Sequence, residues 1–205
     1  MTHSISEMRE NPTHSDPGTW APFFPCRLSG GIQAEETSIA TVREFFQRHF
    51  KEIYAASIAE GGFSPLPESW AEKEGFYSRH ADLFRFHDEG RTVGVYVGNA
   101  LDWSTYYLRH VSFLPSHQGQ GHFQEFFARF LEALAARGME RAQAHVSPAN
   151  LANIHILTKL GFTVTGYELS ERWGANVCLT KFLTQRSLEA FLKQFCWGTK
   201  PQLQH

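Results

Sequence analysis

Cysteine is scarce in this sequence, and the few present are widely spaced. The three residues Cys26, Cys178 and Cys196 are odd in number and show no C-x-x-C spacing. This pattern argues against a disulfide framework or a zinc site and fits a reducing compartment. The sequence therefore predicts a cytoplasmic protein without disulfides.

Charge of one sign and long hydrophobic runs are also lacking. With 19 basic and 21 acidic residues the formal net charge is -2, so nothing indicates a nucleic-acid partner. No apolar run approaches the roughly 20 residues of a membrane span. The N-terminus has no basic segment followed by an apolar one, so no secretory signal and no membrane partner are expected.

Aromatic residues, in contrast, are abundant: the 205 residues include 18 Phe, 5 Trp and 6 Tyr. Such side chains fill a large core or line an apolar cleft, and composition does not choose between the two. The length corresponds to one domain. We expect a flexible N-terminal tail over residues 1–24, a single domain over residues 25–195 and a C-terminal tail over residues 196–205.

Hydrophobic periodicity predicts a mixed α/β domain with one central sheet. Helices are expected at residues 37–60, 123–136, 150–160 and 187–195. Strands are expected at residues 83–87, 92–97, 105–114, 141–147, 163–169 and 175–183. Residues 61–76 contain prolines and several glycines, which favours a loop. The clearest helix has an apolar stripe formed by Phe123, Phe126, Phe127, Phe130, Leu131 and Leu134.

The segment from Phe113 to Phe123 reads FLPSHQGQGHF and is expected to run from a strand through a turn into a helix. Glycine lets the backbone turn tightly and approach a ligand closely. The first amides of the following helix have no internal partners, and with the helix dipole they favour an anion such as phosphate. Many strand–helix connections contain glycine, so the turn alone does not identify a ligand.

Together with a second block, this turn resembles the GNAT superfamily of acyl-CoA N-acyltransferases. The superfamily's signature reads roughly V-x-P-x-x-[RQ]-x-x-G-x-[GA]. It is met here by Phe113 in the Val place and by Pro115, Gln118 and Gly121, with Gly119 at a variable place that commonly holds glycine. The second block is Asn150 and a short helix that ends in Leu160-Gly161-Phe162. The resemblance implies a mixed, mostly antiparallel central sheet with helices on both faces and with splayed fourth and fifth strands.

The resemblance also implies acyl-CoA, most simply acetyl-CoA, as co-substrate. The turn amides are expected to cradle the pyrophosphate, and the edge of the fourth strand to bind the pantetheine arm. A backbone amide near Phe113 is expected to polarise the thioester carbonyl, as an oxyanion hole does. The residues implied in binding are Phe113, Leu114, Pro115, Gln118, Gly119, Gln120, Gly121, His122, Phe123 and Asn150.

Two positions depart from the superfamily's pattern. Phe123 stands where the signature ends in Gly or Ala, and its place on the apolar helix stripe indicates a core residue. The alternative is a side chain that narrows the phosphate turn and weakens CoA binding. Many members carry a Tyr three residues before the Leu of the L-G-F block, where it protonates the leaving thiolate. That place holds Leu157, which cannot donate a proton. Either another group or water does so, or the enzyme is weak or altered.

Candidate catalytic groups lie on the two splayed strands. Peptide N-terminal acetyltransferases of the superfamily often place a Glu where this sequence has His145, and a His can take a proton from an ammonium group. Strand alternation puts Gln143 and His145 on one face; the alternative is a His that only bonds the neighbouring strand. Tyr107 on the fourth strand is the candidate for the missing acid, with packing on the sheet as its alternative.

For other polar residues, the sequence either leaves the role open or indicates a structural one. Arg109 either binds an anionic substrate or forms a salt bridge. His110 is expected on the face opposite Tyr107, in a structural role. His117 and His122 flank the turn and are expected to be solvent-exposed, with contact to phosphate in the protonated form as the alternative. The 11 His residues show no H-E-x-x-H pattern, and no metal site is predicted.

The resemblance implies an acyl-CoA-dependent N-acyltransferase, most simply an N-acetyltransferase. A primary amine of a small molecule or peptide attacks the thioester directly. Two alternatives stay open: a catalytically weak or inactive acyl-CoA-binding or interaction domain, and a transferase of longer acyl chains. The acceptor depends on residues 61–76, on residues 99–104 and on the final strand pair. The sequence does not choose between a monomer and a homodimer.

Overall fold

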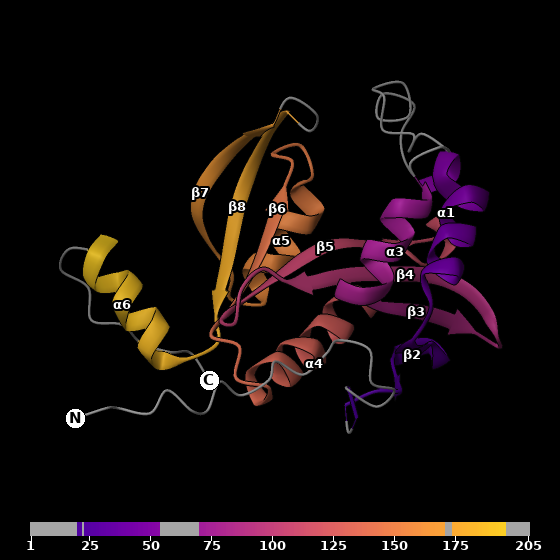
Figure 1. Cartoon of the computed structure of the whole chain (residues 1–205), viewed down its shortest axis with the longest axis horizontal. Helices are drawn as coiled ribbons and strands as arrows, with labels where there is room; N and C mark the ends of the chain where they lie inside the picture. The colour runs from indigo at the N-terminus through magenta and orange to yellow at the C-terminus, as the bar shows by residue number, and fades with distance from the viewer. Residues whose placement is uncertain (1–19, 22, 54–69, 171–173, 196–205) are drawn as a thin grey trace, which may run out of the picture.

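A computed structural model describes residues 20–21, 23–53, 70–170 and 174–195, and its strands form one eight-stranded sheet (Figure 1). The sheet order is β1-β2-β3-β4-β5-β6-β8-β7. The strands are β1 (Cys26–Arg27), β2 (Gln33–Glu36), β3 (Asp82–Asp88), β4 (Arg91–Ala100), β5 (Thr105–Phe113), β6 (Arg141–Val146), β7 (Thr163–Ser170) and β8 (Gly174–Phe182). Only the β5–β6 pair is parallel among these strands. The predicted mixed, mostly antiparallel sheet is thereby confirmed.

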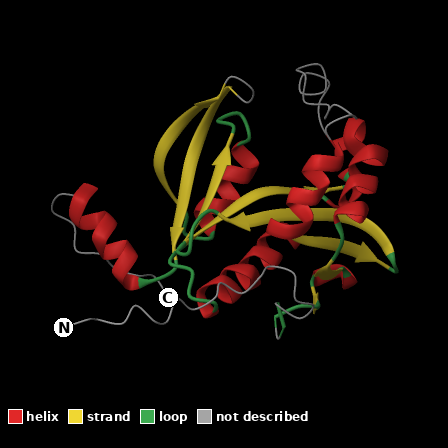
Figure 2. Cartoon of the chain, in the orientation of Figure 1, coloured by secondary structure: helices red, strands yellow, loops and turns green. Residues whose placement is uncertain are grey.

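Helices flank this sheet on both faces (Figure 2). The α-helices are α1 (Ile39–Ile53), α3 (Trp70–His80), α4 (His122–Ala136), α5 (Leu151–Lys159) and α6 (Gln185–Phe195), and the 3-10 helices are η1 (Ser29–Gly31) and η3 (Pro115–His117). None of the helices in the described part of the chain is long and apolar enough to cross a membrane.

Two parts of the predicted element order are wrong. The strands β1 and β2 precede the first helix, and α3 overlaps the loop predicted over residues 61–76. β2 is short and has no apolar alternation; its pairing with β3 decides its conformation. α3 contains Gly75 and no regular apolar stripe, so its sequence resembles a loop.

The packed part of the chain reaches further toward the N-terminus than the predicted boundary at residue 25. Trp20 is 1% exposed, and its indole nitrogen donates to Asp82 Oδ1 at 3.0 Å. Its ring stacks on Phe130 with centroids 4.7 Å apart. Residues 1–19 and 196–205 of the predicted tails lie outside the described residues.

The core between α4 and the sheet is largely aromatic. Phe126, Phe127 and Phe130 of α4 are at most 1% exposed, and their rings contact aromatic residues of β3 and β4, including Phe84 and Tyr96. Burying such a side chain stabilises the fold by about 1.5–3 kcal/mol. Much of the aromatic excess therefore fills a core, as the α4 stripe predicts.

The two faces of the sheet are distinguished by the helices that cover them. Tyr106 of β5 contacts Phe130 of α4, with ring centroids 5.4 Å apart. His110 of β5 contacts Phe46 of α1, with ring centroids 4.8 Å apart. We call these the α4 face and the α1 face. Because Tyr106 pairs with Ala142 and Tyr107 with Gln143, Tyr107 and Gln143 lie on the α1 face.

β5 and β6 are paired only at their beginnings. The parallel ladder runs from Thr105↔Arg141 to Tyr107↔Gln143, and the two strands then separate (Figure 1). The gap between Leu108–Phe113 and Ala144–Val146 is called the strand wedge below. β5 and β6 correspond to the strands that are fourth and fifth in the superfamily's order. The splay that the resemblance implies is therefore confirmed.

A β-bulge interrupts β5 at the beginning of the wedge. Val97 pairs with His110 and Gly98 with Leu108, so Arg109 has no partner on β4. An extra residue shifts the alternation of side chains beyond it. His110 therefore lies on the α1 face together with Tyr107. The prediction that these residues occupy opposite faces is wrong because it assumed an unbroken alternation.

Candidate active site

The predicted phosphate turn joins the end of β5 to the start of α4. Its glycines Gly119 and Gly121 have φ values of 72° and 85°, a left-handed conformation that other residues adopt only at a cost. A Cβ atom at either position would meet no atom within 4 Å. The backbone of the turn therefore borders open space that a ligand can approach.

Several consecutive backbone amides of this turn have no hydrogen-bond acceptor among the described residues. The first helical bond of α4 runs from the Glu125 amide to the Gly121 carbonyl at 3.0 Å, and no side chain in the described part of the chain caps the helix. Among the described residues, no carbonyl accepts from the amides of Gly119, Gln120 and Gly121. Gln118 differs, because its amide donates to the Pro115 carbonyl at 3.3 Å. The positive end of α4 thus offers a set of amides suited to an anion.

Two glutamine side chains hold the turn in place. Gln118 Nε2 donates to the carbonyl of Phe113 at 2.8 Å, and Gln120 Nε2 donates to the carbonyl of Ser116 at 2.7 Å. The matched glutamine of the signature therefore acts within the protein by tying the turn to the end of β5.

His122 is buried, which contradicts its predicted exposure. It is 3% exposed and its ring lies against Phe113, with centroids 5.9 Å apart. Burial lowers the pKa of His122, and the nearby His117 lowers it further, so the ring is neutral at physiological pH. His117 is partly buried and shares a 2.8 Å hydrogen bond with Ser116 Oγ.

Phe113 directs its backbone polar groups into the strand wedge. The Leu114 amide donates to the Val93 carbonyl at 2.8 Å. In an antiparallel ladder, bonded and non-bonded pairs alternate, so the adjacent Phe113–Gly94 pair is non-bonded. The Phe113 amide thus points away from β4. Of the three residues predicted to bind pantetheine, only Phe113 offers an amide to the wedge, since Pro115 has none.

Two further residues of the predicted set have structural partners. Asn150 caps α5, because its Oδ1 accepts from the Asn153 amide at 3.1 Å. Phe123 is partly buried and its ring lies 4.5 Å from that of Phe127. The core interpretation of Phe123 is confirmed, and the part that either residue plays in CoA binding stays a prediction.

The two predicted catalytic residues meet at the beginning of the strand wedge. Tyr107 is the last residue of β5 paired with β6, and its partner there is Gln143. His145 lies two residues beyond Gln143 on the same face of β6. The rings of Tyr107 and His145 meet edge to face with centroids 5.0 Å apart. The structure therefore brings this pair into contact.

Glu168 completes the cluster and was not predicted. Its Oε2 atom lies 2.5 Å from His145 Nδ1. Glu168 belongs to β7, which reaches β6 only through β8, where Cys178 pairs with His145. The sequence signal is a lone Glu in an otherwise uncharged strand, and only the sheet order places it beside His145.

Burial raises the pKa of the Tyr107 hydroxyl. Arg109 acts in the opposite direction, while Glu168 and Cys178 raise the pKa further. The hydroxyl therefore keeps its proton at neutral pH, as a general acid must. Leu157, which occupies the usual place of the acid, is 1% exposed in the core.

Arg109 lies beside this pair, at the bulge of β5. Its guanidinium carbon is 5.3 Å from the Tyr107 ring centroid and 5.9 Å from that of Tyr77 in α3. Its Nε donates to Asn99 Oδ1. Within the described residues it forms no salt bridge, so that alternative of the sequence analysis is not observed. Tyr77 was missed because residues 61–76, which directly precede it and include most of α3, were predicted as a loop.

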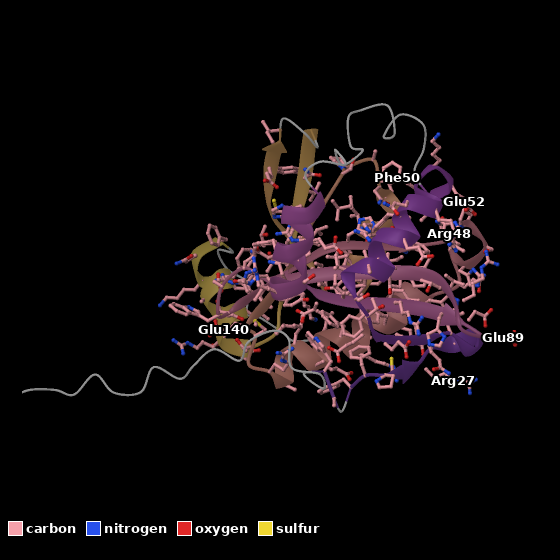
Figure 3. All side chains as sticks on the ribbon, turned by 45° about the vertical axis from the view of Figure 1, so that its right-hand side comes forward. Arg27, Arg48, Phe50, Glu52, Glu89 and Glu140 are labelled. Carbon is pink, nitrogen blue, oxygen red and sulfur yellow. The ribbon has the colours of Figure 1, made fainter. Side chains whose placement is uncertain are left out.

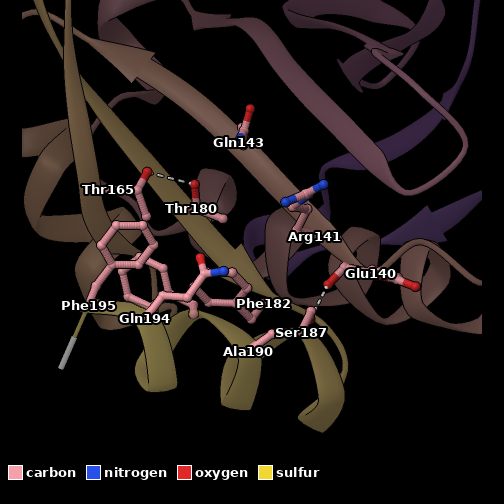
Figure 4. A pocket seen from close by; sticks show the side chains of 11 residues that line it. Glu140, Arg141, Gln143, Thr165, Thr180, Phe182, Ser187, Ala190, Gln194 and Phe195 are labelled. Carbon is pink, nitrogen blue, oxygen red and sulfur yellow. Dashed lines mark hydrogen bonds between the residues drawn. The ribbon is translucent and has the colours of Figure 1, made fainter. Parts of the chain in front are cut away.

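A cavity of about 390 Å³ lies between α6 and the strands β6, β7 and β8 (Figure 4). It is lined by Glu140, Arg141, Gln143, Thr165, Thr180, Phe182, Ser187, Ala190, Phe191, Gln194 and Phe195. Gln143 shares a face of β6 with His145, so the cavity extends the α1 face from the Tyr107–His145 pair toward α6.

Aromatic residues also occur in two segments on which the acceptor is expected to depend, residues 61–76 and 99–104. Phe76 of α3 is 48% exposed beside Tyr77, whereas Trp103 is 87% exposed near the paired end of β5. The side chains of Phe63 and Trp70 lie outside the described residues.

The fold matches those of solved acetyltransferases. One of them is a GNAT family acetyltransferase from Elizabethkingia anophelis with acetyl-CoA bound. The match covers 75% of this chain and 99% of that one, with a TM-score of 0.54 and 11% identity. A second match, to the ribosomal-protein-alanine N-acetyltransferase from Escherichia coli, covers 75% of this chain and 95% of that one, with a TM-score of 0.59 and 12% identity. A third match, to spermidine/spermine N-acetyltransferase SpeG from Vibrio cholerae, covers 78% of this chain and 96% of that one, with a TM-score of 0.56 and 16% identity.

Family membership rests on the sequence itself. No curated protein matches the chain at a significant level. The Acetyltransferase (GNAT) family matches residues 41–162, which is more than half of the chain and includes the turn, the wedge and the Asn150 block. The chain therefore belongs to the GNAT acetyltransferase family.

Proposed function

We propose that the chain transfers the acetyl group of acetyl-CoA to a primary amine by direct attack, with His145 as base and Tyr107 as acid. One observation carries the proposal: the two rings are in contact, 5.0 Å between centroids, where β5 and β6 separate. A proton acceptor and a proton donor thus stand together at the strand wedge, where the family's thioester is expected.

The remaining parts of the wedge suit acyl-CoA. The amides of Gly119, Gln120 and Gly121 and the positive end of α4 favour the pyrophosphate. The amide of Phe113, turned away from β4, stands at the edge that a pantetheine arm would follow and can polarise the thioester carbonyl.

The proposed chemistry assigns each proton to a residue. His145 takes a proton from the acceptor's ammonium group, and the amine nitrogen forms a bond to the thioester carbon. The carbon–sulfur bond then breaks, and the Tyr107 hydroxyl protonates the sulfur. Tyr107 recovers a proton from the nitrogen as the amide forms, and His145 releases its proton to solvent. The Glu168 carboxylate at 2.5 Å stabilises the charged ring of His145.

The test is thiol release from acetyl-CoA with a panel of amines and peptides, for the wild type and two histidine variants. His145→Gln should lower kcat near neutral pH by about 100-fold or more, since general base catalysis contributes about that much. His155→Gln, on the exposed side of α5, is the matched control and should behave as the wild type. Thermal stabilisation by acetyl-CoA should be the same in all three proteins.

Four outcomes would change the proposal. An unchanged rate in His145→Gln would remove His145 from the mechanism. Stabilisation by acetyl-CoA without turnover of any amine would identify an acyl-CoA-binding domain, and faster turnover of longer acyl-CoAs would identify a different donor. No stabilisation by any CoA ester would refute the co-substrate.

A further inference from the structure

We propose that Arg109 binds a carboxylate of the acceptor, so that the acceptor is a small amine with an acidic group near its amino group, as in an amino acid. The inference rests on the proposed function for the position of the amine at His145. It assigns Arg109 a binding role that the sequence leaves open between a substrate contact and a salt bridge.

The charge of Arg109 is not compensated by any residue that the structure describes. The residue is exposed and appears in none of the ion pairs found among residues 20–21, 23–53, 70–170 and 174–195. Arg43 and Arg85, which are less exposed, are each paired with a glutamate. An unpaired guanidinium beside a catalytic pair is a ready partner for an anionic substrate group.

The guanidinium is also held in one orientation. Its Nε donates to Asn99 Oδ1, and Asn99 is 7% exposed with its Nδ2 bonded to the Ala100 carbonyl at 2.9 Å. The rings of Tyr77 and Tyr107 flank it. With Nε occupied, the two terminal nitrogens remain to bind a carboxylate through paired hydrogen bonds. Such a fixed cation loses little entropy on binding.

The spacing favours a short acceptor. The centroid of the Tyr107 ring lies 5.0 Å from the centroid of the His145 ring and 5.3 Å from the guanidinium carbon of Arg109. The base and the cation are thus separated by no more than about 10 Å, and hydrogen bonds of about 2.9 Å are needed at each end. The space left suits an amine and a carboxylate separated by a few covalent bonds.

The distribution of charge points the same way. Glu168 lies at the His145 end of the cluster, where it favours an ammonium group, and Arg109 lies at the other end. A carboxylate meets attraction at Arg109, whereas a second amine of a polyamine meets repulsion there. The order of charges therefore matches an amino acid and opposes a polyamine.

The test compares acceptors that differ only in charge: α-amino acids, their carboxamides and spermidine, each with saturating acetyl-CoA. The wild type should prefer the acid over the amide by about 10-fold or more in kcat/KM, since hydrogen bonds to charged groups contribute that much. Arg109→Gln should abolish the preference by raising KM for the acid, and Arg109→Lys should keep part of it. Arg48→Gln, which removes an exposed charge on the outer side of α1 (Figure 3), should keep the full preference.

A calorimetric titration of the same acids and amides into the CoA-saturated protein separates this inference from the proposed function. If amines are acetylated but acid and amide react equally, the inference is overturned and the proposed function stands. If nothing is acetylated, yet the acid binds more tightly than the amide and Arg109→Gln removes that difference, the inference stands alone. Equal binding of acid and amide to the wild type would overturn it.

Discussion

His145 Nδ1 and Glu168 Oε2 lie 2.5 Å apart, although their strands are separated in the sheet by β8. A carboxylate at Nδ1 fixes the ring and leaves Nε2 as the nitrogen that can accept a proton from a substrate. The pair therefore makes Glu168 a positioning residue for the proposed base.

Changing Glu168 should lower the rate of acetyl transfer without weakening the binding of acetyl-CoA. Glu168→Gln keeps a polar partner for Nδ1 but removes the charge, and we expect kcat to fall by about 10-fold. Glu168→Ala removes both and should be slower still. Steady-state kinetics with the exposed α4 variant Glu132→Gln as control checks this order; an unchanged kcat in Glu168→Ala would show that the pair is only structural.

Removing the Tyr107 hydroxyl should slow the protonation of the thiolate. Tyr107→Phe keeps the ring and its contact with His145, and we expect kcat to fall by about 10-fold or more. Because burial raises the pKa of Tyr107 above its ordinary value, its proton is retained as the pH rises through 9. Wild-type kcat should therefore show no alkaline loss from this group below about pH 10.

The control for Tyr107 is Tyr167→Phe, which alters a 76% exposed residue of β7 and should leave kcat unchanged. If Tyr107→Phe retains the wild-type kcat with its best acceptor, the leaving thiolate is protonated by another group or by water.

A methyl group in the phosphate turn should weaken acetyl-CoA binding beyond its effect on stability. Gly121 and Gly138 have φ values of 85° and 81°, and a Cβ at either meets nothing within 4 Å. Gly121→Ala and Gly138→Ala should each lose about 1 kcal/mol of unfolding free energy to backbone strain. Only Gly121→Ala should also raise the Kd for acetyl-CoA, as measured by calorimetry; equal Kd values would place the pyrophosphate elsewhere.

His110 should make the fold sensitive to mild acid. Burial lowers its pKa to about 4, whereas an unfolded chain has a His pKa of about 6.5. The unfolded state therefore binds the proton first, so stability is full above about pH 6.5 and is lost as the pH falls toward 4. The loss attributable to this residue is on the order of 3 kcal/mol.

Urea unfolding between pH 7 and pH 4 measures this dependence. His110→Gln should flatten the curve relative to the wild type, while the exposed His155→Gln should leave its shape unchanged. Parallel curves for His110→Gln and the wild type would contradict the assignment to His110.

Local signals in the sequence were sufficient for much of the fold. The spacing of Phe126, Phe127 and Phe130 specifies the buried side of α4, because helical periodicity alone determines which residues share a face. The cap of α5 is equally local, since Asn150 bonds an amide only three positions along the chain. α3 escaped prediction because it carries no such local periodicity.

The predicted phosphate turn belongs to the same local category, and the proposed acceptor side does not. Gly119 and Gly121 are contiguous with α4, so one segment contains all the amides proposed to bind the pyrophosphate. Arg109 acquires its position from a bulge that only the pairing with β4 reveals.

The sequence by itself determined the family, the α4 core stripe and the turn that suits an anion, because each is written in consecutive residues. Only the tertiary structure decided that Tyr107 contacts His145, that Glu168 joins them and that Arg109 stands unpaired beside them among the described residues. These relationships depend on sheet order and register, which bring together residues that are far apart along the chain.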